Sequence, residues 1–138
     1  MERVILRFLD KRLMKGYLEK FSPSDDTVSI EGEDSVRTEV GLGELKGIFF
    51  VKSFAGDKKH REKKSFKGNP FNSKKVFVRF RDGESMFGFV EGEVPWEKGF
   101  FLHAERNNGF FVKPADGTSN NIKIFVVASS IDDVTVVE

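Results

Sequence analysis

A run of basic side chains between Lys58 and Lys75 is the densest group in the sequence that could bind a ligand. Eight lysines and arginines stand there against one acid, so the segment carries +7 although the whole chain carries only +1. Closely spaced cations lower the free energy of a bound polyanion, and the segment is therefore a candidate anion site. The same composition, with interspersed Gly, Asn, Pro and Ser, is more typical of a solvated linker. The candidate anion-binding residues are Lys58, Lys59, Arg61, Lys63, Lys64 and Lys67.

The sequence PADGTSNN, from Pro114 to Asn121, is a second candidate site. Its side chains are rich in hydrogen-bonding groups, and the loop stands between two apolar segments. Such a loop suits ligand recognition, but the same side chains also cap the backbone of long turns, which is the more common role. The candidate ligand-loop residues are Asp116, Ser119, Asn120 and Asn121.

Residues that could perform catalysis or hold a cofactor are few. The two histidines, His60 and His103, are not spaced as metal ligands, and the chain has no cysteine. No G-x-S-x-G nucleophile turn is present, and Gly41-Leu42-Gly43 lacks the lysine and the following helix of a phosphate-binding loop. We therefore expect no catalytic residue, metal site or cofactor, and no enzymatic activity.

An internal repeat shows which elements must position these residues. The segment VILRFLDKRLMKGYLEK, which starts at Val4, aligns with VFVRFRDGESMFGFVEG, which starts at Val76. An alternating apolar pattern around a short polar turn predicts a β-hairpin in each copy. Asp-Gly in the second copy favours a type I′ turn, and Asp10-Lys11 occupies the same place in the first. The identical pairs include Val4/Val76, Arg7/Arg79, Phe8/Phe80, Asp10/Asp82, Gly16/Gly88 and Glu19/Glu91.

The rest of the chain also predicts short strands and little helix, because no segment has a sustained 3.6-residue period. We expect a third hairpin in Gly99 to Lys113, with its turn at Asn107-Asn108-Gly109. The predicted organisation is a first small barrel in residues 1–53, a basic linker in 54–74 and a second barrel with an extra hairpin in 75–138. Further strands are expected near Thr27–Glu31, Val36–Val40, Lys46–Phe54, Ile122–Val127 and Asp132–Val137, with turns at Gly41–Leu45 and Ala128–Ile131.

Paired phenylalanines stand at Phe49-Phe50, Phe100-Phe101 and Phe110-Phe111. Neighbouring residues of a strand point to opposite faces of the sheet, so each pair places an aromatic ring on both faces. Both faces then need cover, either from the other copy or from a second subunit. Rings left uncovered would instead suit the stacking of single-stranded nucleic acid bases, a less common arrangement.

Composition is that of a globular protein, with 38% hydrophobic and 33% charged residues in 138 positions. No stretch approaches the roughly 20 apolar residues of a membrane span, and the N-terminal apolar run is too short for a secretion signal. We expect a cytoplasmic protein.

Three segments resemble a family of small bacterial proteins of unassigned function. They are KGIFFVKSFAG from Lys46, VRFRDGESMFGF from Val78, and GFFVKPADGTSNNIKIFVV from Gly109, which match FFVKxFxG, FxDGExxxG and GFFxxPADxxSNN in order. More weakly, a strand, an Asp-Gly turn, a second strand and a closing turn-strand unit resemble the Sm-like small β-barrel. The Sm-like resemblance implies an all-β fold of two packed Sm-like halves. The resemblance to the bacterial family implies no activity.

Two classes of function remain open. The first is a non-catalytic binding or adaptor module that contacts a protein partner or forms a homo-oligomer. The second is a ligand receptor, for RNA as in Sm-like barrels or for cyclic di-GMP as in PilZ-like barrels. Arg3 and Arg7 have the R-x-x-x-R spacing of the PilZ-like receptors, but they fall within a predicted strand. We favour the binding module without nucleic acid or a membrane as partner.

Overall fold

The protein is all-β, and the computed structural model describes residues 2–54, 73–91, 96–97, 101–102, 108–115 and 119–137. Ten strands form one antiparallel sheet, and two short strands form another. Single 3-10 turns, η1 (Leu42–Glu44) and η2 (Ala128–Ser130), precede β5 and β12. None of the described residues belongs to a helix that is long and apolar enough to cross a membrane. The strands are β1 (Arg3–Phe8), β2 (Leu13–Lys20), β3 (Thr27–Glu31), β4 (Arg37–Gly41), β5 (Leu45–Val51), β6 (Ser73–Phe80), β7 (Ser85–Glu91), β8 (Trp96–Glu97), β9 (Phe101–Leu102), β10 (Gly109–Pro114), β11 (Asn121–Val127) and β12 (Ile131–Val136).

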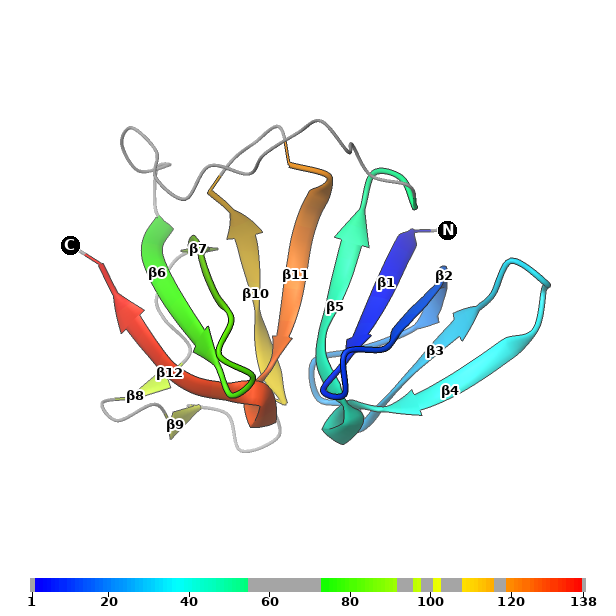
Figure 1. The fold of residues 1–138 in the computed structure, drawn as a ribbon, viewed down its shortest axis with the longest axis horizontal. Helices are drawn as coiled ribbons and strands as arrows, with labels where there is room; N and C mark the ends of the chain where they lie inside the picture. Colours follow the sequence, from blue (N-terminus) through cyan, green and yellow to red (C-terminus); the bar gives the residue numbers. More distant parts are fainter. Residues whose placement is uncertain are drawn as a thin grey trace.

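The large sheet is open and runs through both parts of the chain without a break. Its strand order is β12-β6-β7-β10-β11-β5-β1-β2-β3-β4. We call β1 to β5 the N-terminal half, and β6, β7 and β10 to β12 the C-terminal half. The halves join where β11 pairs with β5, and β4 and β12 lie at the opposite ends (Figure 1).

The two halves have the same connectivity. In each, a hairpin is followed by two more strands, a 3-10 turn and a last strand that returns to pair with the first. The hairpin registers also agree, since Val4 lies opposite Gly16 in one half and Val76 lies opposite Gly88 in the other. Each half has a register shift where the last strand meets the end of the first, beside Phe8 and near Ile131.

The turns of the two matching hairpins differ from the predicted type. Lys11 and Gly83 have positive φ angles of 74° and 91°, but neither aspartate before them does. A type I′ turn requires positive φ at two central residues, so that prediction is wrong. Each turn is a three-residue loop in which the carboxylate of Asp10 or Asp82 accepts a hydrogen bond from the N–H two residues ahead, at 3.1 and 2.9 Å. The aspartate fixes the loop, and the left-handed residue closes it.

The third predicted hairpin is also wrong. β10 pairs with β7 on one side and with β11 on the other, while β9 pairs with β8 in the separate small sheet. The partners of β10 come from other parts of the chain, which local sequence signals do not report. Gly109 is the first residue of β10. Glycine fits this position because a Cβ atom there would overlap the carbonyl oxygen of Val126 on the neighbouring strand.

The core consists of two clusters on opposite faces of the sheet. Alternate residues of the central strands enter different clusters: Phe50 and Phe125 belong to the N-terminal core, and Phe49 and Ile124 to the C-terminal core. Each half thereby covers one face of β5 and β11, which explains why every residue of β5 is buried. Both faces of the Phe49-Phe50 pair are thus covered within one chain.

Only part of the other two phenylalanine pairs lies within the described residues. Phe110 is buried, whereas Phe111 is 36% exposed and packs edge-on against Phe125, with their ring centroids 5.1 Å apart. Lys123 lies over the Phe111 ring, 5.1 Å from its centroid. Phe100 and the side chain of Phe101 lie outside the described residues.

Candidate functional site

The basic segment predicted as an anion site or linker lies largely outside the described residues, although Ser73 and Lys74 begin strand β6. Both histidines also fall outside, as does Asp116 of the predicted ligand loop. No cluster of three or more potential metal ligands occurs within the part of the chain that the structure describes. The predicted residues outside it are Lys58, Lys59, Arg61, Lys63, Lys64, Lys67, Asp116, His60 and His103.

In the described end of the predicted ligand loop, Asn120 and Ser119 bind the backbone and Asn121 lines a cleft. Asn120 accepts a hydrogen bond from the Ser53 N–H (3.1 Å) and donates one to the Ser53 carbonyl oxygen (3.0 Å), so it holds the loop to the segment that follows β5. Ser119 is buried, and its Oγ accepts the N–H of Asn121 at 3.1 Å. The carboxamide of Asn121 has no hydrogen-bond partner among the described residues, and this side chain lines a cleft.

The cleft lies between the halves, on the face of the C-terminal core, and has a volume of about 180 Å³. Phe49 from β5 and Ile124 from β11 line it from the central strands, which pair directly with each other. The β6–β7 hairpin contributes Met86 and Phe87, and β1 contributes Arg7. Polar and apolar side chains therefore meet in one small space between the two hairpins of the repeat.

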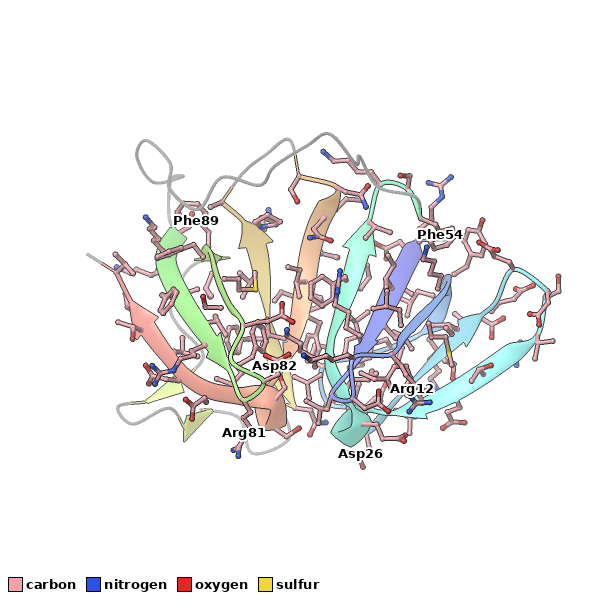
Figure 2. All side chains as sticks on the ribbon, viewed as in Figure 1. Arg12, Asp26, Phe54, Arg81, Asp82 and Phe89 are labelled. Atoms are coloured by element: carbon pink, nitrogen blue, oxygen red, sulfur yellow. The ribbon has the colours of Figure 1, made fainter. Side chains whose placement is uncertain are left out.

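A buried ion pair connects the β6–β7 turn to the N-terminal half at one end of the cleft. Lys46 of β5 is 6% exposed at its side chain, and its Nζ lies 2.9 Å from Asp82 and 3.1 Å from Glu84. Figure 2 shows Asp82 at the turn, near the middle of the molecule. Burial alone would raise the pKa of Asp82, but the hydrogen bonds from Lys46 and from the Glu84 N–H, with the charges of Lys46 and Lys11, lower the pKa below its ordinary value.

Arg7 is the cation of the cleft without a balancing acid. Its guanidinium carbon lies 4.8 Å from the centroid of the Phe49 ring, and it makes no ion pair with any described residue. Arg79, its counterpart in the repeat, pairs with Asp132 at 3.1 Å. The residue at the matching place in the N-terminal half, one after the start of the last strand, is Lys46. The half that contains Arg7 thus has a lysine where the other half has an acid.

Sequence reasoning missed this cleft, although it named Arg7 and Asn121 for other reasons. The R-x-x-x-R arginines both lie in β1, as expected, where Arg3 Nη1 donates to the Lys52 carbonyl oxygen at 3.2 Å. A signal was present in the sequence, because the last turn and strand of each half, GLGELKGIFFV and VVASSIDDVTVV, can be aligned so that Lys46 matches Asp132. An acid beside the arginine in one segment and a lysine in the other indicate that only one half can form this ion pair.

Fold and cleft together define an all-β protein with one open antiparallel sheet and a small polar cleft where its two halves meet. Comparison with protein families shows that the whole chain, residues 1–138, belongs to the family of unknown function DUF6982. This membership agrees with the resemblance to a family of unassigned function. Comparisons with curated proteins and with solved structures found no match.

Proposed function

We propose that this protein is a non-catalytic binding module of two Sm-like halves, which binds a partner protein through an open edge of its sheet. The observation that carries the proposal is the position of β12. Within the described residues it has β6 on one side and no strand on the other. An edge strand presents unpaired N–H and C=O groups, to which an extended segment of another protein can add as a further strand.

Matching features of the two halves support an architecture of two small barrel-like units. The sequence repeat has a constant offset of 72, and both hairpins keep the same register across it. Each half has the strand order last-first-second-third-fourth, with a 3-10 turn before the last strand. In this interpretation the two units opened toward each other and share the strand pairing between β11 and β5.

Residues at the edges favour a different protein over a second copy as partner. The joint between halves depends on Gly47, where a Cβ atom would lie 2.9 Å from the Phe125 carbonyl oxygen. Asp133 has the corresponding register position in β12, opposite Arg79, as Gly47 is opposite Arg7. If β12 of one chain paired with β4 of a second copy as β5 pairs with β11, the Asp133 side chain would be pressed against the backbone of the neighbouring strand.

The other open edge has the same obstacle. Glu39 of β4 and Phe125 of β11 hold equivalent positions, each three residues before its 3-10 turn. In the same pairing between two chains, the carboxylate of Glu39 would therefore occupy the place that the buried Phe125 ring occupies in the joint within one chain. Charged residues at such positions are a known device against edge-to-edge association. Self-assembly is therefore the weaker of the two forms of association.

The sequence of β12 indicates what a partner strand should contain. Asp133 is exposed, Val134 is half-buried and Val136 is 37% exposed. Opposite charges and apolar pairs across strands stabilise a ladder, so a basic side chain should lie near Asp133 and apolar ones near the valines. The partner is thus an extended segment that alternates apolar or threonine residues with lysine or arginine.

Fluorescence anisotropy with labelled synthetic peptides of about eight residues, alternating Val or Thr with Lys, tests the proposal. We expect wild-type protein to bind them, Asp133→Lys to weaken binding, and Glu39→Lys on the opposite edge to leave it unchanged. Equal loss in both variants, or no binding by the wild type, would contradict the role of β12. Sedimentation of the wild type as a concentration-dependent oligomer would point to self-assembly instead.

A further inference from the structure

We propose that the cleft between the halves binds a carboxylate that is joined to a small apolar group. The carboxylate belongs either to a free small molecule or to the C-terminus of a peptide. This site is separate from the β12 edge and does not depend on the function proposed for that edge.

Arg7 provides the recognition of the anion. A guanidinium has several N–H donors in a plane and forms paired hydrogen bonds with a carboxylate. The Phe49 ring supports this group at 4.8 Å, so its orientation is restricted before any ligand binds. The matching arginine of the other half is already occupied, because Arg79 pairs with Asp132. Of the two matching arginines, only Arg7 lines the cleft, and it makes no ion pair with any described residue.

Two further polar groups in the cleft suit the same anion. Asn121 has a carboxamide without a partner among the described residues, and its NH₂ group can donate to a ligand oxygen. Lys46 is held by Asp82 and also by Glu84, whose side chain is 65% exposed. A ligand carboxylate can replace the exposed Glu84 at Nζ, since Asp82 still balances part of the lysine charge.

The apolar part of the lining selects what the carboxylate is attached to. Phe87, Met86 and Ile124 line the cleft beside Phe49. A volume of about 180 Å³ is below the range of sites for drug-sized ligands, so the apolar group is small. Inorganic phosphate alone would leave these side chains uncovered.

The experiment is a two-dimensional ¹H–¹⁵N NMR titration of the full chain, with ligand pairs that differ only in charge. Benzoate is compared with benzamide, and acetyl-alanyl-phenylalanine with its C-terminal amide, each up to about 10 mM, because affinities near this level are weak but measurable. We expect the acids to shift the amide signals of Phe49 and Asn121 and the amides to leave them unchanged. Binding of benzoate alone identifies a small-molecule site, and tighter binding of the peptide acid identifies C-terminal capture.

Two variants and one matched control decide whether the cleft is responsible. Arg7→Gln and Asn121→Asp should each weaken binding of the acids by at least about tenfold, while Arg79→Gln should bind like the wild type. The spectrum of each variant also reports whether it is folded, and either cleft variant can serve if the other is not. The proposal is overturned if no acid shifts the cleft signals, if the amides bind equally well, or if Arg79→Gln loses binding as Arg7→Gln does.

Discussion

Replacing Asp82 with asparagine should strongly destabilise the protein through the ion pair that joins the halves. Asparagine keeps an oxygen that can accept the Glu84 N–H in the turn, but it removes the charge beside Lys46. Lys46 is 6% exposed and Asp82 14% exposed at their side chains, so water cannot replace the lost partner well. Breaking a buried pair by removing one member costs 3 to 5 kcal/mol in other proteins, and we expect about 2 to 3 kcal/mol here because Glu84 still reaches Nζ.

Urea unfolding followed by circular dichroism measures this loss. At an m-value of about 1 to 3 kcal/mol per molar urea, the midpoint should fall by about 0.7 to 3 M without a change in m. Asp10→Asn is the matched control, because Asp10 has the same turn geometry and pairs with Arg12 at 2.6 Å, but its side chain is 57% exposed. Exposed pairs contribute little, so the control should unfold near the wild-type midpoint.

A double variant separates the charge from the turn. Adding Lys46→Met to Asp82→Asn removes the buried cation, which in the single variant keeps only the exposed Glu84 as its partner, so the double variant should be more stable than Asp82→Asn alone. If Asp82→Asn and Asp10→Asn shift the midpoint equally, or if Lys46→Met restores nothing, the reasoning about burial is refuted.

Three further results follow from the turns, the close strand contacts and the acid–base properties. Lys11→Gly should raise the stability by about 0.5 to 1 kcal/mol and the melting temperature by roughly 2 to 4 °C, because φ is 74° there; calorimetry that shows a decrease would contradict the strain. Gly88→Ala should cost about 2 to 3 kcal/mol in urea unfolding, since its Cβ would lie 2.6 Å from the Lys113 carbonyl oxygen, whereas Gly43→Ala, with no atom within 4 Å, should be tolerated. The pKa of Asp82 is lowered on folding, so its contribution is present above the ordinary value of 3.8 and is lost as the pH falls through the folded value. The stability difference between wild type and Asp82→Asn should therefore be constant near neutral pH and shrink in acid; a difference that grows in acid would reverse the sign of the argument.

Strand positions could be predicted from the sequence to a large extent, because alternation and the repeat are local signals. The all-β class and the hairpin containing Asp82 follow from the period of two in Val76 to Glu91. The turn type could not be predicted from Asp-Gly alone, since the same dipeptide fits a two-residue loop or the last two positions of a three-residue loop. Which loop forms depends on how many residues separate the paired ends, here Phe80 and Glu84.

Pairing between distant strands was beyond the sequence signals. β10 was expected to pair with the segment before it, but its ladder partners are β7 and β11. Nothing in GFFVKP itself distinguishes these partners, because an apolar strand can pair with any apolar neighbour. The cleft was missed for the same reason: Arg7 and Asn121 are distant in sequence, and only the pairing of β11 with β5 brings them to one space.

The joint between halves is also where the two aligned segments differ in charge. An acid at the same place in both halves would give two equal ion pairs, but only Arg79 and Asp132 form one. In the N-terminal half the acid's place is taken by Lys46, which instead reaches across the joint to Asp82. Lys46 therefore links the halves, and Arg7 makes no ion pair with any described residue. Lys46 thus makes a contact between the halves at the position where the other half has Asp132, and a ligand carboxylate would supply at Arg7 the charge that Asp132 supplies at Arg79.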